Sequence, residues 1–347
     1  MITEHISLKN LNSFGIEVRA KYFASFADKN SLEACLEDAS KLNQSLSLHP
    51  LILGGGSNIL FTHDVDGLVL KNEITGIETI GEDDDHVFIK AGAGENWHRF
   101  VMHCIEKDYA GVENLALIPG SVGASPMQNI GAYGVEIKDV FHSLEAYHIA
   151  DKKWVTFNKM ECAFGYRESV FKNKFKQQFI IGAVTYQLNK KPVFNTSYGA
   201  ITQELETMQV TKLSIGAIAQ AVMRIRSSKL PDPAVIGNAG SFFKNPEVEA
   251  AVFEKLKDQF PGLVGYRLDN GRVKLAAGWL IEHSGPAKGI SWKGYRIGDA
   301  GCHAKQALVL VNYGQAPGSE ILALSDAIIQ SVWQNFSVRL EREVNIV

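Results

Sequence analysis

A serine inside a glycine-rich turn is the first residue whose setting suits chemistry. Ser241 lies in the segment Gly237–Pro246 and is followed directly by two phenylalanines. A hydrolase nucleophile elbow needs a glycine two residues after the serine, but Phe243 occupies that position and no histidine lies nearby as a base. A hydroxyl in an apolar turn suits proton donation better than acyl transfer. The alternative is a serine that only shapes the turn, which is the commoner role.

An arginine between aromatic residues is the second candidate. Arg167 lies in the segment Phe164–Ser169. Its planar guanidinium can hold a carboxylate through two parallel hydrogen bonds. The alternative is a surface arginine that pairs with the neighbouring Glu168.

The C-terminal tail carries two acids in a strand-like pattern. A period of two places Glu341 and Glu343 on one face, and Leu340, Arg342 and Val344 on the other. This geometry does not choose which acid enters a site. A solvated, charged strand end is the alternative to a functional role.

A run of three glycines follows a short apolar segment that predicts a buried strand, Leu51–Leu53. We call Gly54–Asn58 the glycine turn. Its glycines allow a sharp bend and bring backbone N–H groups close to an anion. A dinucleotide-binding fingerprint would need a further glycine where Ile59 stands, so a Rossmann fold is not indicated. A simple turn at the end of a strand is the alternative.

A second glycine-punctuated segment, Pro119–Gly134, is called the long loop. It has four glycines, two prolines and no charged residue. Loops of this length are usually functional or disordered, and disorder normally comes with charge and few apolar residues. Because this loop contains Val122, Ile130 and Tyr133, we expect it to be ordered around a flat, partly apolar ligand. With the glycine turn it would form a two-sided cradle for a pyrophosphate and an isoalloxazine ring.

The elements that must position these residues belong to a chain of 347 residues, 46% apolar and 21% charged. This length predicts two or three domains. The net charge of −3 does not favour nucleic acid as a partner. The N-terminus has no signal-peptide pattern and no segment is apolar enough to insert in a membrane, so we expect a cytoplasmic protein. The scattered cysteines and histidines predict buried, reduced thiols and no metal site.

Apolar periodicity predicts both helices and strands. Helices are expected at 32–42, 96–108, 215–226, 247–259, 275–283 and 320–336. Strands are expected at 51–53, 67–70, 86–91, 144–149, 154–157, 179–188, 307–312 and 338–347, with a hairpin turn at 150–153.

Together the motifs resemble one family, the UDP-N-acetylenolpyruvoylglucosamine reductases (MurB family), over almost the whole chain. The matching segments are Asn12–Gly15, Leu53–Asn58, Gly92–His98, Glu113–Gly120, Gln128–Gly134, Phe164–Arg167, Lys229–Pro233, Gly237–Pro246, Lys274–Ile281 and Gln306–Leu308. The chain resembles the longer subclass of this family, which carries a loop with a tyrosine. Here that segment, Asn195–Gly199, is called the tyrosine loop.

The resemblance implies an α+β protein. Its expected architecture is a two-domain FAD-binding fold of the PCMH or vanillyl-alcohol-oxidase type, followed by a third α+β substrate-binding domain. We place the FAD-binding subdomains at residues 1–73 and 74–226, and the substrate-binding domain at 227–336. Residues 337–347 are expected to form a strand that returns to the active site.

The resemblance also implies the reaction. NADPH would reduce FAD, which would pass a hydride to C3 of UDP-N-acetylglucosamine enolpyruvate, and a proton at C2 would complete UDP-N-acetylmuramate for peptidoglycan synthesis. By matching motifs, Ser241 is the expected proton donor, Arg167 holds the substrate carboxylate, and Glu343 is the acid of the tail. A serine needs help to be acidic, from a charge such as Lys229 or from a water chain.

The same matching assigns contact positions. FAD would be held without a covalent bond, since neither cradle segment contains histidine or cysteine, and the chain is expected to be a monomer. The expected FAD contacts are Gly54, Gly55, Gly56, Ser57, Asn58, Pro119, Gly120, Ser121, Gly123, Ala124, Ser125, Asn129, Gly131, Ala132, Tyr133, Gly134 and Arg226. The expected substrate contacts are Tyr198, Lys229, Asn245, Tyr266 and Gln306.

Two other functions remain open at this point. One is an FAD-dependent oxidase of the same fold that acts on a sugar or an alcohol and uses oxygen in place of NADPH. The other is a nucleotide-sugar-binding protein without catalysis, which would be colourless when purified.

Overall fold

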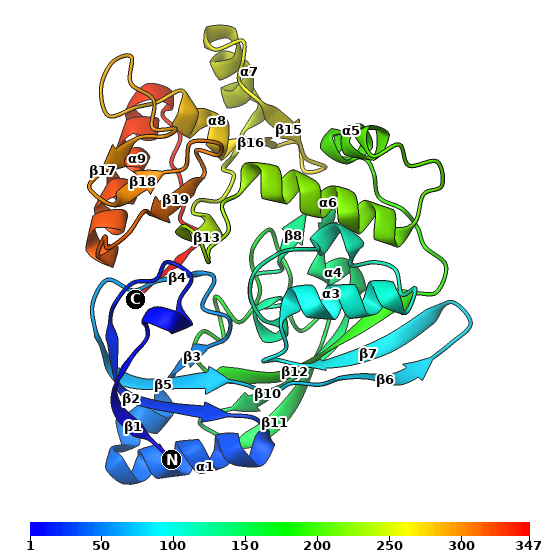
Figure 1. Cartoon of the computed structure of the whole chain (residues 1–347), viewed down its shortest axis with the longest axis vertical. Helices are drawn as coiled ribbons and strands as arrows, with labels where there is room; N and C mark the ends of the chain where they lie inside the picture. The colour runs from blue at the N-terminus through cyan, green and yellow to red at the C-terminus, as the bar shows by residue number, and fades with distance from the viewer. The chain divides into compact units, whose positions relative to one another are not determined.

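The computed structural model describes all 347 residues, and the chain divides into two compact units. The first unit comprises residues 1–6, 19–56 and 65–228, and the second comprises 7–18, 57–64 and 229–347 (Figure 1). One of the points where the chain passes between the units therefore falls inside the glycine turn, after Gly56.

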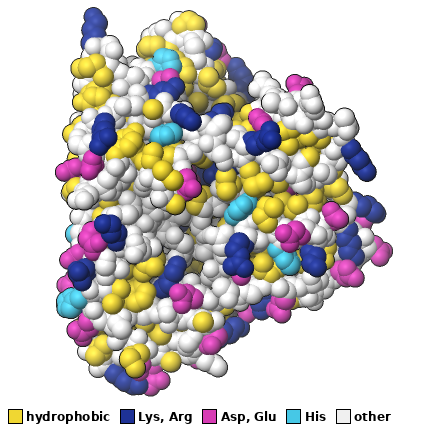
Figure 2. Space-filling view, in the orientation of Figure 1, with side chains coloured by type: hydrophobic (Ala, Val, Ile, Leu, Met, Phe, Trp, Pro, Cys, Tyr) yellow, Lys and Arg dark blue, Asp and Glu magenta, His cyan; other side chains and the backbone are white.

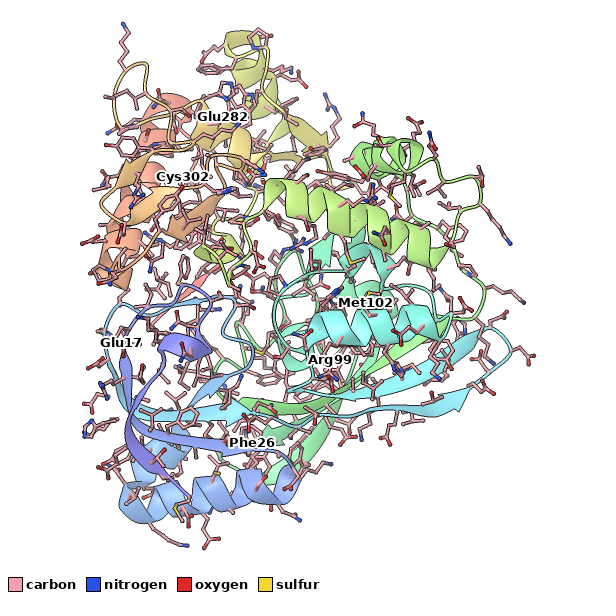
Figure 3. The ribbon with its side chains drawn as sticks, viewed as in Figure 1. Glu17, Phe26, Arg99, Met102, Glu282 and Cys302 are labelled. Carbon is pink, nitrogen blue, oxygen red and sulfur yellow. The ribbon has the colours of Figure 1, made fainter.

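The first unit begins with a four-stranded sheet in the order β1-β2-β5-β3. Its strands are β1 (Thr3–Ser7), β2 (Arg19–Phe26), β3 (Leu51–Leu53) and β5 (Val65–Asn72), and both β2 and β3 run parallel to β5. Helix α1 (Lys29–Leu42) begins at a capping box in which Asp28 and Ser31 exchange hydrogen bonds. Its apolar stripe packs with Phe26, Leu68 and Leu70 in one core. Figure 1 shows α1 beside the sheet, and Figure 3 labels Phe26.

A second, five-stranded antiparallel sheet completes the first unit, in the order β11-β10-β12-β7-β6. The strands are β6 (Ile77–Glu82), β7 (His86–Gly92), β10 (Phe141–His148), β11 (Lys153–Asn158) and β12 (Phe179–Asn189). Their core includes residues of α3 (Trp97–Glu106), α4 (Ile137–Val140), α5 (Gly199–Thr207) and α6 (Ile215–Lys229). The shorter elements of this unit are α2 (Gln44–Leu48), η2 (Glu113–Leu115), η3 (Val122–Ala124), β8 (Gly131–Ala132) and β9 (Val135–Glu136).

The second unit contains two further small sheets. One has the order β13-β19-β18-β17, from β13 (Gly237–Ser241), β17 (Arg296–Ile297), β18 (Ala300–Cys302) and β19 (Val309–Asn312). The other has the order β14-β16-β15, from β14 (Glu247–Val248), β15 (Gly265–Arg267) and β16 (Val273–Leu275). The remaining elements are η1 (Lys9–Leu11), α7 (Ala250–Gln259), α8 (Ala277–Glu282), α9 (Gly318–Phe336) and a parallel pair of β4 (Ile59–Leu60) with β20 (Asn345–Ile346).

Most predicted elements are confirmed, including the hairpin of β10 and β11, but several predicted bounds were wrong, including those of α7, α8 and the C-terminal tail. Helix α7 starts at Ala250, because Glu247 and Val248 pair with β16. Helix α8 starts at Ala277 and not at 275, since Leu275 belongs to β16. In the tail predicted as strand 338–347, only β20 is a strand, and Arg342 forms a single bridge to Phe243.

The helices, the cysteines and the charged side chains of the surface agree with what the composition predicts. No helix is both long and apolar enough to cross a membrane. All four cysteines are buried and unpaired, as predicted, and burial raises the pKa of the Cys162 and Cys302 thiols to about 12. Acidic and basic side chains alternate over the face seen in Figure 2.

Candidate active site

The glycine turn and the long loop touch each other through their backbones within the first unit. A Cβ atom added to Gly54 would lie 2.4 Å from the Ser121 hydroxyl oxygen, and one added to Gly55 would lie 2.8 Å from the Gly120 Cα atom. Gly120 also has a φ of +126°, which favours glycine. A side chain at Gly54 or Gly55 would obstruct this approach, so the two predicted halves of the cradle are adjacent.

A lysine that the motif analysis did not identify lies under the glycine turn. Lys71 of β5 is in register with Leu53, and its ammonium donates a hydrogen bond to the carbonyl of Gly54. It is half-buried and forms no ion pair, and burial lowers its pKa. A buried-strand run that ends in lysine, Leu68–Lys71, was the signal in the sequence.

Two polar side chains of the long loop are buried and form hydrogen bonds within the protein. Ser125 is fully buried, and its hydroxyl lies 2.7 Å from that of Tyr186. Asn129 is also fully buried; its amide nitrogen donates to Gly165 and Glu136, and its oxygen accepts from Lys138. These bonds order the loop from within, so contacts from Ser125 and Asn129 to a ligand would involve their backbones.

Arg167 is attached to the same loop. Its guanidinium donates to the carbonyls of Gly131 and Asn129, the latter at 3.4 Å, and lies 4.0 Å from the Glu136 carboxylate. The backbone of Arg167 is left-handed, with a φ of +55°, an unusual conformation for a residue with a side chain. A strained turn therefore presents the arginine to the long loop 36 residues earlier in the chain.

The far end of the long loop meets two other predicted contact residues. The rings of Tyr133 and Tyr198 pack edge to face, with ring centroids 5.2 Å apart. Arg226 of α6 donates a hydrogen bond to the Leu117 carbonyl at 3.2 Å, and its charge acts on the Tyr133 hydroxyl. Burial lowers the pKa of Arg226 and raises that of Tyr133, and the arginine's charge partly offsets the shift of the tyrosine. The same cation adds to the lowering of the His98 pKa, which burial dominates.

In the second unit, Ser241 lies at the end of β13, beside the chain's C-terminal tail. The Glu343 N–H donates to the Phe242 carbonyl at 2.9 Å, and the Lys244 N–H donates to the Glu341 carbonyl at 2.8 Å. The Glu341 side chain pairs with the Lys244 ammonium at 3.0 Å. These bonds place the backbone of Glu343 one residue away from Ser241 across the antiparallel pair.

The tail is also tied to the glycine turn. The Asn58 amide donates to the Glu343 carbonyl at 3.3 Å, and the Asn345 amide donates to the Asn58 carbonyl at 2.9 Å. Asn58, an expected FAD contact, therefore helps to hold the backbone of Glu343, the acid that the family resemblance selects in the tail.

Two of the predicted substrate contacts meet at the first turn of α8. Asn245 accepts a hydrogen bond from the Ala277 N–H at 2.9 Å, and the Gln306 oxygen would lie 2.9 Å from a Cβ on Gly278. Tyr266 is 49% exposed on β15, and Lys229 is the exposed last residue of α6. Arg167 and Tyr198 belong to the first unit, whereas Ser241 and Glu343 belong to the second.

Comparison with known proteins fits this arrangement. A family model described as UDP-N-acetylenolpyruvoylglucosamine reductase, C-terminal domain, matches residues 232–347, and one described as FAD binding domain matches residues 20–158. The UDP-N-acetylenolpyruvoylglucosamine reductase of Amoebophilus asiaticus is 51% identical over 346 residues, covering 100% of this chain and 99% of the relative. That of Pseudomonas aeruginosa is 46% identical, covering 99% and 98%.

A solved structure shows the same fold. The UDP-N-acetylenolpyruvylglucosamine reductase of Thermus caldophilus aligns with a TM-score of 0.67 at 21% identity, over 100% of this chain and 99% of the other. The expected α+β class, an FAD-binding fold followed by a C-terminal domain, is thereby confirmed. The chain belongs to the UDP-N-acetylenolpyruvoylglucosamine reductase family.

Proposed function

We propose that this protein reduces UDP-N-acetylglucosamine enolpyruvate to UDP-N-acetylmuramate, using FAD and NADPH, in peptidoglycan precursor synthesis. The full-length similarity to reductases of that name carries the proposal. The adjacent glycine turn and long loop fit FAD, because their backbones meet where a Cβ atom would intrude. Bound FAD supplies the hydride chemistry, so the protein must bind, orient and protonate.

Three side chains carry the proposed chemistry of the protein. Arg167 binds the substrate carboxylate, which gains negative charge as the enol ether is reduced. Ser241 gives the proton to C2, and Glu343 completes the proton path at the tail. Contacts between the Glu343 backbone, Phe242 and Asn58 support this assignment, since they hold the acid beside the serine turn.

The remaining assignments extend the same proposal. The glycine turn, the long loop and Arg226 bind FAD, and Tyr198, Lys229, Asn245, Tyr266 and Gln306 bind the UDP-sugar. Domain boundaries at residues 73, 226 and 336, a monomeric state and a cytoplasmic location complete the proposal.

A single preparation tests this function. The purified protein should show a flavin spectrum, and NADPH should bleach it. Rapid reoxidation should then require the enolpyruvyl UDP-sugar, with UDP-N-acetylmuramate as the product. Oxygen-driven turnover on a sugar or alcohol would instead indicate the oxidase, and a colourless protein that binds the UDP-sugar would indicate the non-catalytic function.

Gly55→Ala should weaken FAD binding about 10- to 100-fold, because overpacking costs about 1–3 kcal/mol. The new methyl group would lie 2.8 Å from the Gly120 Cα atom, and backbone cannot rotate aside as a side chain can. Titration of the apoprotein with FAD measures the change. Gly67→Ala is the control, since its nearest neighbour would be 4.0 Å away. Equal FAD affinity in both variants would contradict the proposed cradle.

Lys71→Met should weaken FAD binding about 10- to 100-fold, the scale of a hydrogen bond to a charged group. The half-buried ammonium next to Gly54 has no acidic partner, so a diphosphate at the glycine turn would supply its counter-charge. Affinity for ADP should fall with that for FAD, while riboflavin, which lacks phosphate, should bind unchanged.

Two further variants separate charge from support of the turn. Lys71→Gln keeps a donor for the Gly54 carbonyl but loses the charge, so its affinity for FAD should be as low as that of Lys71→Met. Lys21→Gln is the control, because Lys21 is exposed and pairs with Asp66. Full FAD affinity in Lys71→Gln would limit Lys71 to a structural role.

A further inference from the structure

A buried amide joins the tyrosine loop to the long loop. Asn114, in η2, is 1% exposed and donates hydrogen bonds to the carbonyls of Tyr133, at 3.0 Å, and Asn195, at 2.9 Å. Both partners are carbonyl oxygens, so the nitrogen of this amide must face them. One side chain therefore connects a position expected at the flavin with the segment that carries Tyr198.

A second amide makes the reverse connection. Asn195 donates to the Gly134 carbonyl at 3.0 Å, while its oxygen accepts from the N–H and hydroxyl of Ser197. Gly134 has a φ of +82°, and a Cβ there would lie 3.1 Å from the Asn195 nitrogen, so glycine permits the approach. The edge-to-face contact of Tyr133 and Tyr198 then closes the set, with ring planes at 86°.

We propose that Asn114 and Asn195 are positioning residues that clamp the tyrosine loop onto the long loop, so that order at the flavin and affinity for the UDP-sugar are coupled. This inference rests on the proposed function for the role of Tyr198. A ligand that orders one loop lowers the cost of ordering the other, because the same two amides hold both. Neither asparagine needs to touch substrate or cofactor.

Asn195→Ala is the main test, made in the FAD-loaded full-length protein. It leaves the Asn114–Tyr133 bond in place and removes the bond to Gly134. Amide hydrogen exchange over residues 193–199 should accelerate about tenfold or more, because protection reports local opening. The KM for the enolpyruvyl UDP-sugar should rise about 5- to 30-fold, the scale of one or two buried hydrogen bonds, while bleaching by NADPH is unchanged.

Asn114→Ala should free both loops. It should accelerate amide hydrogen exchange in residues 193–199 and in 131–134. It should also weaken the binding of both FAD and the UDP-sugar. In the double variant with Asn195→Ala, the rise in KM should be smaller than the product of the two single effects, since both changes release one loop. If Asn114→Ala fails to fold, Asn195→Ala alone decides the proposal.

Asn12→Ala is the matched control. Asn12 is also buried and also donates to backbone carbonyls, those of Leu8, Ile16 and, at 3.4 Å, Lys9, but it lies in the second unit. It should lower stability without changing exchange in residues 193–199. Unchanged exchange in Asn195→Ala, or an equal fall of both half-reactions, would overturn the clamp. Exchange needs no substrate, so failure of the wild type to turn over the UDP-sugar would count against the proposed function only.

Discussion

Ser241→Ala is expected to slow reoxidation of the reduced flavin by the enolpyruvyl UDP-sugar about 10²- to 10⁴-fold, the usual scale for losing a general acid. Bleaching of the flavin by NADPH should be unchanged, because that half-reaction needs no proton at C2. The selective loss distinguishes a proton donor from a serine that merely shapes its turn.

The structure gives physical reasons for choosing this hydroxyl. Ser241 follows Gly240, whose φ of +69° creates the bend, and precedes Phe242, which is fully buried. Its neighbours therefore limit access of water on one side. The backbone N–H of Glu343 donates to the Phe242 carbonyl beside this turn, and the Glu341 carboxylate is paired with the Lys244 ammonium.

Stopped-flow absorbance of the flavin measures the two half-reactions separately. Ser284→Ala is a suitable control, because Ser284 is another small alcohol of the second unit, and its buried hydroxyl donates to the Ile281 carbonyl. Its reoxidation rate should match that of the wild type. If Ser241→Ala slows both half-reactions alike, the serine supports the site but does not supply the proton.

Local patterns in the sequence were sufficient for much of the fold. The apolar stripe of α1 and the alternation of β10 with β11 follow directly from periodicity, because each element buries one face. In the tail, a period of two separates Leu340 and Val344, which are buried, from Glu341, which is exposed. It did not show that the tail lacks a continuous ladder.

Contacts between distant segments are what the sequence could not reveal. Lys71 meets Gly54 because β5 and β3 are neighbours in a sheet, and Asn114 meets Asn195 across 81 residues. The left-handed backbone of Arg167 likewise has no local signal such as glycine. Motif matching therefore predicted candidate residues, whereas their supporting partners needed the fold.

Arg167→Lys is expected to lower turnover of the enolpyruvyl UDP-sugar about 10- to 100-fold although the charge is kept. The guanidinium donates to the carbonyls of Gly131 and Asn129. Its five N–H donors stand in a fixed planar fork that matches the geometry of a carboxylate. A lysine ammonium has three donors on a flexible stem and cannot hold both loop carbonyls and a carboxylate in one plane. The loss corresponds to about 1.5–3 kcal/mol for a hydrogen bond to a charged group.

Comparing two ligands shows whether the arginine acts on the carboxylate or only on the loop. UDP-N-acetylglucosamine has no enolpyruvyl carboxylate, so its affinity should be nearly the same in Arg167→Lys and wild type, while that of the enolpyruvyl sugar falls. Arg99→Lys, on the exposed side of α3, should change neither (Figure 3). If the affinities for both ligands fall equally in Arg167→Lys, the arginine organises the long loop through Gly131 and Asn129 and has no separate role at the carboxylate. An unequal loss assigns it both tasks, because the donors bound to the loop fix the direction in which the remaining donors point.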